Sequence, residues 1–348
     1  MARKKKELPI IGLIASKNPV SALESTVQSL FDGGASRVIV INDGSDDKSS
    51  KKVFKRVAKN GAEVIHLKKN VGKSNALRAG FLIIPEKCII VQTDDDTLSG
   101  DLTKPAQLIR DGKADIVDIR VEVIRTNSLI GSVQELAYWM VNAVIKRLQD
   151  YCNARLWMSG ASAMYSYEAG KVLLLEKSHT LTEDTEGLFR ARAKGFRAKY
   201  YSNKDSQFYT MVPEDLSGLH KQWKRWTTGS GQVMRIYGLG GGSYRVAIVN
   251  FIFWADMIIV PIPEFLHYGL VSSAFWAFSM GLLTGMVGAL RLKRYRLVLF
   301  GVFFPLFAFL WIAHALQGLY LANRMSKSGE TALTWVSPKR TAFEPPTA

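Results

Sequence analysis

The chain has 348 residues, of which 46 are Lys or Arg and 30 are Asp or Glu, so its net charge is +16. Residues 1–245 carry 38 basic and 26 acidic side chains, whereas residues 246–348 carry 8 and 4 and hold long apolar runs. This asymmetry excludes a single soluble globule, and the 47% share of hydrophobic residues excludes a disordered chain. Cys88 and Cys152 are far apart, which argues against a disulfide framework or a structural zinc site. No nucleic-acid partner is expected, because the positive charge is spread along the chain without a recognised motif.

Four short apolar runs alternate with helix-like segments in the first hundred residues. Continuous apolar strands separated by helices predict an α/β domain with a parallel sheet covered by helices on both faces. In such sheets ligands bind beyond the carboxyl ends of the strands, so chemistry is expected directly after each strand. The predicted strands are 8–15, 37–42, 62–67 and 87–93, and the predicted helices are 20–32, 46–60 and 72–83.

Polar side chains follow three of these strands. Asp43 comes after the second strand, Lys73 after the third, and the run from Asp94 to Asp96 after the fourth. Asp43 and Lys73 are each also compatible with a simple turn or helix cap. Three adjacent carboxylates repel one another unless solvent or a cation neutralises them, and Asp94 and Asp96 can both reach one Mg²⁺ or Mn²⁺ bound with substrate phosphates. The three segments together predict a nucleotide-diphosphate site with a metal.

Two later motifs have both a functional and a structural interpretation. Glu183 and Asp184 precede a helical pattern, where acidic residues also serve as caps and dipole partners. Gln222, Arg225 and Trp226 fall in the run QWKRW, whose indoles and cations are also typical of anchoring at a membrane surface.

The C-terminal part is predicted to contain membrane helices. Residues 267–290 and 297–322 contain no charged side chain, and each stretch exceeds the about 20 residues that cross the hydrocarbon core. A third helix is predicted over 246–263, which is shorter and contains Asp256, an intramembrane carboxylate to which no role is assigned.

The basic loop 291–296 bears on the number of spans. Three spans place this loop on the cytosolic side together with residues 1–245, as the positive-inside bias expects, whereas two spans place it outside. We therefore expect a cytosolic domain over 1–245, a membrane region over 246–323 and a tail over 324–348. The expected location is integral to the plasma or cytoplasmic membrane, with the lipid bilayer as a partner.

Six motifs in this order resemble the family-2 glycosyltransferases, most of all the processive membrane branch of hyaluronan, chitin, cellulose and poly-N-acetylglucosamine synthases. The resemblance covers roughly residues 8–230 and implies a GT-A (Rossmann-like) domain, a nucleotide sugar, usually a UDP-sugar, and Mg or Mn as cofactor. It implies a nucleotide-sugar half over 8–100 and an acceptor half over 101–230. The motifs are VIVINDGSDD, NVGKSNALRAG, QTDDDT, WMSGASAMY, LTEDTEGLFRARAKGF and QWKRW.

The resemblance also implies roles for the donor-side residues. Asp43 would contact the uracil and Lys73 the nucleotide. Asp94 and Asp96 match the Asp-x-Asp positions, which face the ribose and the metal-bound diphosphate. Asn42 stands where the family often has a first Asp, so this sequence departs from the family pattern at that position.

The catalytic and acceptor residues follow from the same resemblance. Asp184, preceded by Glu183, matches the general base that takes a proton from the acceptor hydroxyl in an inverting single displacement. Gln222 and Arg225 match groups that face the diphosphate, and a guanidinium there neutralises the charge of the leaving group.

The acceptor itself is expected to meet two elements. Trp226 matches the platform for the acceptor sugar, and Ser159 and Gly160 match a loop beside it.

The expected function is a membrane hexosyltransferase that extends a β-linked polysaccharide from a UDP-hexose or UDP-N-acetylhexosamine. One alternative is transfer of a single sugar to a polyprenyl phosphate or other lipid acceptor, and another is a non-catalytic membrane protein that binds nucleotides. Three helices are few for a polysaccharide channel, so either the chain forms a homo-oligomer or it does not secrete a long polymer.

Overall fold

The computed structural model describes residues 7–19, 21–239, 243–248, 269, 278–279 and 281–328. Its strands are β1 (Ile10–Ser16), β2 (Arg37–Asn42), β3 (Glu63–His66), β4 (Ile89–Thr93), β5 (Thr97–Leu98), β6 (Ile116–Ile119), β7 (Val121–Val123), β8 (Ala163–Ser166), β9 (Ala198–Tyr201) and β10 (Phe208–Thr210). Its α-helices are α1 (Ala22–Asp32), α2 (Lys48–Lys59), α3 (Lys73–Phe81), α4 (Thr103–Arg110), α5 (Leu129–Met140), α6 (Lys146–Tyr151), α7 (Tyr167–Gly170), α8 (Glu183–Ala193), α9 (Leu216–Tyr237), α12 (Leu297–Gly301) and α13 (Phe304–Ser328). Two π-helical turns, η1 (Val141–Ile145) and η2 (Lys171–Leu175), and a 3₁₀ turn, η3 (Lys204–Ser206), complete the set.

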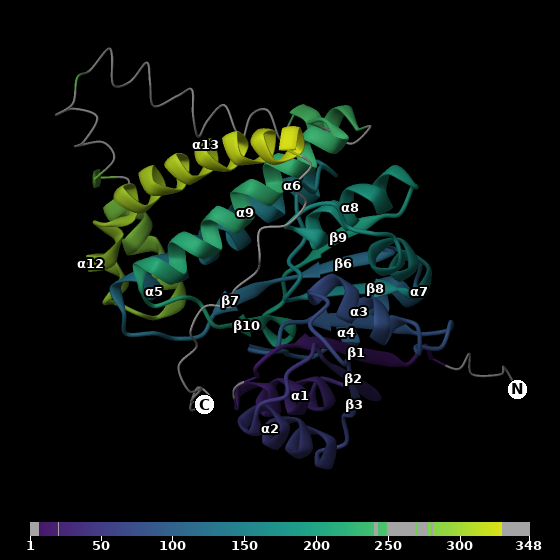
Figure 1. Ribbon diagram of the computed structural model, residues 1–348. Helices are drawn as coiled ribbons and strands as arrows, with labels where there is room; N and C mark the ends of the chain where they lie inside the picture. Colours follow the sequence, from purple (N-terminus) through teal and green to yellow (C-terminus); the bar gives the residue numbers. More distant parts are fainter. Residues whose placement is uncertain are drawn as a thin grey trace, which may run out of the picture.

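A seven-stranded sheet in the order β3-β2-β1-β4-β8-β6-β9 forms the centre of the molecule (Figure 1). The strands β3, β2, β1 and β4 are parallel, as predicted from the sequence. Their residues alternate between two apolar layers. Val38 and Val40 pack with helices α1 and α2, whereas Ile39 and Ile41 pack with α3 on the other face. Burial of each such side chain contributes about 1.5–3 kcal/mol to the stability of the folded state. The two layers confirm the predicted sheet with helices on both faces.

Beyond the four predicted strands, the sheet is not parallel throughout. Strand β8 runs antiparallel to both β4 and β6, and its first residue, Ala163, pairs with Gln92 near the end of β4. Because β8 starts at the carboxyl edge of β4, the loop that precedes it lies at the edge where the parallel strands end. Residues 157–162 therefore lie at the edge of the sheet where the site is predicted.

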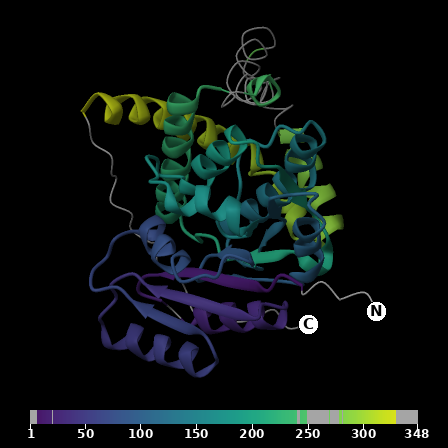
Figure 2. The ribbon, with the colours of Figure 1, turned by 90° about the vertical axis from the view of Figure 1, so that its right-hand side faces the viewer.

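The second half of the domain stacks above the parallel half. Figure 2 shows α5 to α9 over the sheet, with α13 along the top. A small three-stranded sheet, β5-β10-β7, joins the two halves. Helix α9 carries the QWKRW run; Asp215 caps it by accepting a hydrogen bond from the amide of Gly218 at 2.8 Å, and it ends at Gly238 with φ 67°. A residue without Cβ suits this left-handed position.

Helix α13 packs along α9 (Figure 1). A Cβ at Gly318 would stand 2.5 Å from the carbonyl carbon of Thr227, so only glycine allows the two backbones to approach this closely. The same pair of helices buries Trp223 of α9 against Phe307 and Trp311 of α13, with ring centroids 6.1 and 5.2 Å apart. The C-terminal segment is thus part of the structure that holds the QWKRW run.

The predicted membrane segments are described only in part. Residues 249–263 and most of 267–280 lie outside the described residues; 281–292 are helical. The stretch predicted as one helix over 297–322 is split between α12 and α13, and α13 continues to residue 328. Within the described ranges, no helix combines the length and the apolar character needed to cross a bilayer.

Candidate active site

Asp43, directly after β2, joins the loops that follow β2 and β3. It is 4% exposed, and its two carboxylate oxygens accept hydrogen bonds from the amides of Val71 and Gly72 at 2.7 and 3.0 Å. Gly44 has φ 72°, and a Cβ there would stand 2.4 Å from the amide nitrogen of Asn70. The carboxylate of Asp43 therefore fixes the position of the loop that leads to Lys73.

Asn42 has a defined structural role at the position where the resembled family often has an acid. Its amide nitrogen donates to the carbonyl of Ser45 at 2.9 Å, and its side-chain oxygen accepts from the amide of Ser45 at 2.8 Å. The same amide lies 3.0 Å from Nδ1 of His66. A neutral amide can both donate and accept, which a carboxylate cannot, and this explains why the turn tolerates Asn.

Lys73 opens α3 and connects three predicted site residues. Its ammonium group pairs with Asp94 after β4, and it lies 3.8 Å from Oε1 of Glu183 at the start of α8. Burial alone would lower the pKa of Lys73, but Asp94 and Glu183 together outweigh this effect and raise the pKa. Lys73 is therefore a permanent cation between two carboxylates that the sequence places 89 positions apart (183 − 94).

Asp184, the predicted base, lies at the first turn of α8 and is held by two amides. Its Oδ2 accepts from Gly160 at 2.8 Å and its Oδ1 from Thr185 at 2.7 Å. Burial and the charge of Glu183 raise the pKa of Asp184 to about 6, against the opposing effects of Lys73 and the two amides. A carboxylate with such a pKa is ionised near neutrality and is still basic enough to take a proton.

The loop that supplies Gly160 rests on a buried ion cluster that sequence reasoning missed. Asp118 of β6 pairs with Arg155 and lies 3.0 Å from the ammonium of Lys146, and the three side chains are at most 3% exposed. The second oxygen of Asp118 accepts from the amide of Ser159 at 3.2 Å. The sequence pattern of a strand does not show whether an acid such as Asp118 in β6 is buried. The ion cluster could therefore not be predicted from the sequence.

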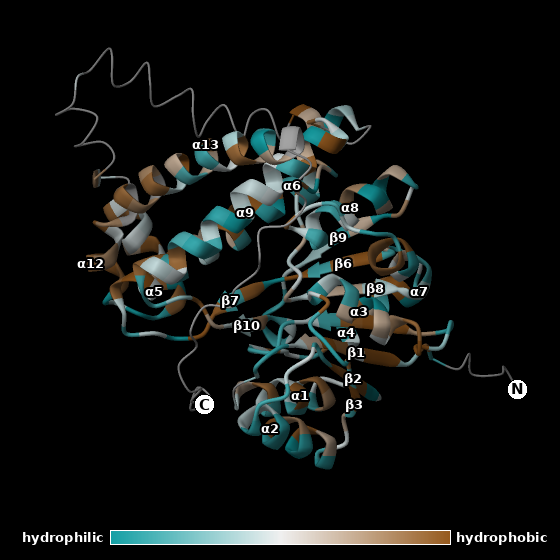
Figure 3. Ribbon diagram, viewed as in Figure 1, coloured by the Kyte–Doolittle hydropathy of each residue, from teal (hydrophilic) through white to brown (hydrophobic). Residues whose placement is uncertain are grey.

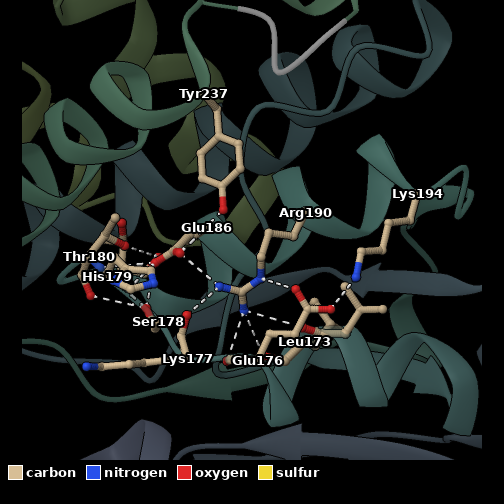
Figure 4. Close-up of polar contacts among 12 residues, drawn as sticks. Leu173, Glu176, Lys177, Ser178, His179, Thr180, Glu186, Arg190, Lys194 and Tyr237 are labelled. Atoms are coloured by element: carbon tan, nitrogen blue, oxygen red, sulfur yellow. Dashed lines mark hydrogen bonds and ion pairs between the residues drawn. The ribbon is translucent and has the colours of Figure 1, made fainter.

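A second buried network holds the segment before Asp184. Figure 4 shows Glu186, which is fully buried, between the segment 178–180 and Arg190. One of its oxygens accepts from the hydroxyl of Ser178 and from the amides of His179 and Thr180, at 2.7, 2.7 and 3.0 Å. Its other oxygen accepts from Arg190 at 2.8 Å, and the hydroxyl of Tyr237 donates to it at 3.4 Å. Because Tyr237 ends α9, Glu186 links the start of α8 to the helix with the QWKRW run.

Arg225 of α9 and the acidic segment after β4 act on the same hydroxyl. The negative charges of Asp94 and Asp96 act on the hydroxyl of Tyr138 in α5 and, after burial, raise its pKa, while the positive charge of Arg225 opposes them. The three predicted residues are thus within electrostatic reach of one hydroxyl. Tyr138 was not predicted as a site residue, because it falls in an ordinary amphipathic helix.

Gln222 and the two tryptophans of α9 differ in their surroundings. The side-chain oxygen of Gln222 is buried and has no hydrogen-bond partner among the described residues. A buried amide oxygen without a partner is costly, so this atom is suited to a ligand. Trp223 is a core residue with 7% exposure, whereas Trp226 is half-buried, with its ring centroid 6.5 Å from that of Trp311. No described contact joins Trp226 to Asp184, so its role stays a prediction.

Asp94 and Asp96 are chemically suited to a divalent metal that is bound together with the phosphates of the substrate. Asp96 is 8% exposed and follows Asp94, whose side chain is 33% exposed. Among the described residues, no group of three or more His, Cys, Asp or Glu side chains is close enough to hold a metal by itself. Two carboxylates with remaining ligands from phosphate and water match the way Mg²⁺ and Mn²⁺ bind nucleotides.

Comparison with known proteins adds a family match and several relatives. The family model described as glycosyl transferase family 2 matches residues 13–171. The chain is 27% identical over 228 residues to poly-beta-1,6-N-acetyl-D-glucosamine synthase of Staphylococcus aureus, and 25% identical to the synthase of the same name from Staphylococcus epidermidis. Each match covers 64% of this chain and 54% of the relative, so the chain spans about half the length of these curated relatives.

A solved structure is similar over most of the chain. It is a mannosyltransferase from Pyrobaculum calidifontis in complex with GDP-Man and Mn²⁺, with a TM-score of 0.58. The similarity covers 90% of this chain and 88% of the other, at 15% sequence identity. At that identity the comparison establishes the fold, which is the predicted GT-A fold.

Proposed function

Because residues 13–171 form a family 2 glycosyltransferase domain, we propose that this chain is a membrane-associated inverting glycosyltransferase that extends a β-linked polysaccharide. The proposed donor is a UDP-hexose or a UDP-N-acetylhexosamine. The observation that carries the proposal is the carboxylate of Asp184, with its pKa raised to about 6 and its orientation fixed by the amide of Gly160. The similarity to the poly-N-acetylglucosamine synthases favours an amino sugar and a polymeric product.

The proposed reaction is a single displacement at the anomeric carbon. Asp184 takes the proton from the acceptor hydroxyl as the hydroxyl oxygen attacks, and the bond from the anomeric carbon to the diphosphate breaks. Glu183 keeps the base strong by its nearby charge, and the two amides on Asp184 prevent its rotation. A second carboxylate nucleophile is not needed for this stereochemistry.

The departing diphosphate gains negative charge, which cations of this chain are placed to neutralise. Lys73 pairs with Asp94, and Arg225 acts with Asp94 and Asp96 on the hydroxyl of Tyr138. A bound Mg²⁺ or Mn²⁺ at Asp94 and Asp96 would supply further charge stabilisation. The buried oxygen of Gln222 is placed on the same helix as Arg225 and is available to a donor or acceptor hydroxyl.

Apolar and basic groups in the C-terminal part support the proposed contact with a bilayer. Helices α12 and α13 are coloured largely as hydrophobic in Figure 3, and Leu299, Phe309 and Tyr320 are 65–70% exposed. Arg294 of the basic loop 291–296 pairs with the buried Glu135 of α5, which supports placing this loop on the same side as the catalytic domain.

The proposal is tested by measuring nucleotide release and product size together. Full-length protein in membranes is incubated with a panel of UDP-sugars and GDP-mannose, with Mn²⁺ or Mg²⁺. We expect UDP release from one or two donors and a high-molecular-weight product. Asp184→Asn is the control, in which donor binding persists and release is lost.

Other results would change the conclusion in defined ways. Release of UDP with only a lipid-soluble monosaccharide product would replace polymer extension by single-sugar transfer to a lipid. Nucleotide binding without turnover of any donor would contradict the enzymatic proposal.

A further inference from the structure

A cavity of about 400 Å³ lies at the far end of α8 from Asp184. It is bounded by the last turn of α8, by the start of β9, by the turn after α6 and by Ser243. Asp184 is in the first turn of α8 and Arg192 lies eight residues later, so the cavity is about 12 Å along the helix from the proposed base.

Three arginines line this cavity: Arg155, Arg192 and Arg197. Arg192 donates to the carbonyls of Asn153 and Arg155 at 2.8 and 3.4 Å, which are neutral acceptors. In the part of the chain that the structure describes, no carboxylate lies within 4.0 Å of its guanidinium nitrogens. Burial and the charge of Arg155 lower the pKa of Arg192, as expected for a cation that lacks a counter-ion.

The carboxylates near the cavity pair with the other two arginines that line it. Asp118, which pairs with Arg155, also neutralises Lys146. Asp115 accepts from both the amide and Nε of Arg197, at 2.8 and 3.2 Å. The three lining arginines are therefore matched by two carboxylates, one of which also pairs with Lys146, so the cavity keeps a net positive charge.

We propose that this cavity binds a small phosphate-bearing anion, with the guanidinium of Arg192 as its main contact. Planar guanidinium groups bind phosphate through paired hydrogen bonds, and an excess of positive charge favours an anionic ligand. The volume exceeds that of a phosphate group alone and is in the range of small-ligand sites, which fits a phosphorylated sugar or similar molecule. This proposal does not rest on the proposed glycosyl transfer.

The cavity also has a direct connection to the loop at Gly160. Arg155 lines it, and the carboxylate of Asp118 that pairs with Arg155 holds the amide of Ser159. The Arg155 side chain is 1% exposed and pairs with Asp118, so the cavity ends against the ion pair that supports this loop.

Binding is measured by calorimetry on the full-length protein in lipid nanodiscs, with inorganic pyrophosphate as the probe. EDTA is present throughout, so that metal-dependent binding of the probe at Asp94 and Asp96 is suppressed. We expect saturable binding to the wild type and a loss of affinity of about tenfold or more in Arg192→Gln, the effect of removing one charge-assisted contact.

A matched pair of variants separates charge from folding. Ala193 is exposed on the last turn of α8 and lines the cavity, so Ala193→Glu introduces a negative charge and Ala193→Gln a neutral side chain of the same size. Ala193→Glu is expected to weaken binding about tenfold, and Ala193→Gln less than about twofold. Arg147→Gln, an exposed arginine of α6 that bonds to Ser202, is expected to bind as the wild type does.

Equal affinity in Ala193→Glu and Ala193→Gln would overturn the proposal, as would the absence of saturable binding to the wild type. If Arg192→Gln fails to fold, the Ala193 pair alone decides. A uniform loss in all four variants, including Arg147→Gln, would indicate non-specific binding to the positive surface and would also overturn it.

Discussion

The amide of Gly160 donates a hydrogen bond to Oδ2 of Asp184 at 2.8 Å, and a Cβ on residue 160 would stand 2.8 Å from the same oxygen. The loop before β8 therefore both orients the proposed base and fits closely around it. The backbone of Gly160 does not adopt a positive φ, so backbone conformation does not require glycine here. The close contact with the carboxylate of Asp184 does require it.

Gly160→Ala is expected to lower turnover by about 10- to 100-fold, because the new methyl group displaces the carboxylate of Asp184 by a fraction of an ångström. The ion pair of Lys73 and Asp94 is not affected, so donor affinity should stay within about twofold. UDP release gives turnover and calorimetry gives donor affinity, while an unchanged melting temperature controls for folding. Turnover at the wild-type level would show that the position of Asp184 is not critical.

The acid limb of the pH profile follows from the pKa of Asp184. Below about pH 6 the carboxyl is protonated and cannot accept the proton of the acceptor hydroxyl, so activity should fall to half near pH 6. Glu183→Gln removes the charge that helps to raise this pKa, and the midpoint should move to lower pH. Rates between about pH 4.5 and 8 test this directly. A midpoint that stays in place or moves to higher pH would contradict the assignment of Asp184.

Lys73→Met is expected to shift the same midpoint in the opposite direction. Lys73 lowers the pKa of Asp184, so its removal favours the protonated carboxyl and moves the midpoint to higher pH. Donor affinity should fall about tenfold or more, since a charge-assisted contact to the diphosphate is lost. The two variants form a sign test, because a general effect on folding would move both midpoints the same way.

Removal of divalent metal tests the pair of carboxylates after β4. EDTA should abolish nucleotide release and added Mn²⁺ should restore it. Asp96→Asn should raise the Mn²⁺ concentration needed for half of the maximal rate by about tenfold. Asp101→Asn is a suitable control, since Asp101 is an acid near the same segment that bonds to Thr103. Full activity of the wild type in EDTA would exclude the proposed metal.

The parallel half of the sheet could be predicted from the sequence because its strands are short, apolar and bounded by turns. The predicted strand 37–42 coincides with β2, and the predicted helix 46–60 differs from α2 by one or two residues at each end. The predicted family resemblance and enzyme class are confirmed by the match to glycosyl transferase family 2. The motif order could establish this because the first three motifs lie at the ends of β2, β3 and β4, and the later ones keep their order along the chain.

The contacts that support the site could not be predicted, because they join residues far apart in the chain. Asp118 and Ser159 are 41 positions apart, and His220 and His314, whose ring nitrogens lie 2.7 Å apart, are 94 apart. The antiparallel direction of β8 could not be predicted either, because the direction of a strand depends on where the loop before it lies in the fold. The apolar pattern of 297–322 led to the prediction of a membrane helix, and it gave no indication that α13 would pack along α9.

Replacing Trp223 by Ala and replacing Trp226 by Ala are expected to affect stability differently, although both residues lie in the same QWKRW run. Trp223 is buried against Phe307, Trp311 and His314, so Trp223→Ala should lower the free energy of unfolding by about 3–5 kcal/mol. Trp226 is half-buried, so Trp226→Ala should leave stability within about 2 kcal/mol of the wild type. If Trp226 is the platform for the acceptor sugar, its loss should raise the KM for the acceptor about tenfold, and Trp226→Phe should restore most of the affinity. Denaturation curves and acceptor kinetics on both variants check this. A large loss of stability in Trp226→Ala with unchanged acceptor KM would make Trp226 a second core residue and leave the acceptor to other side chains.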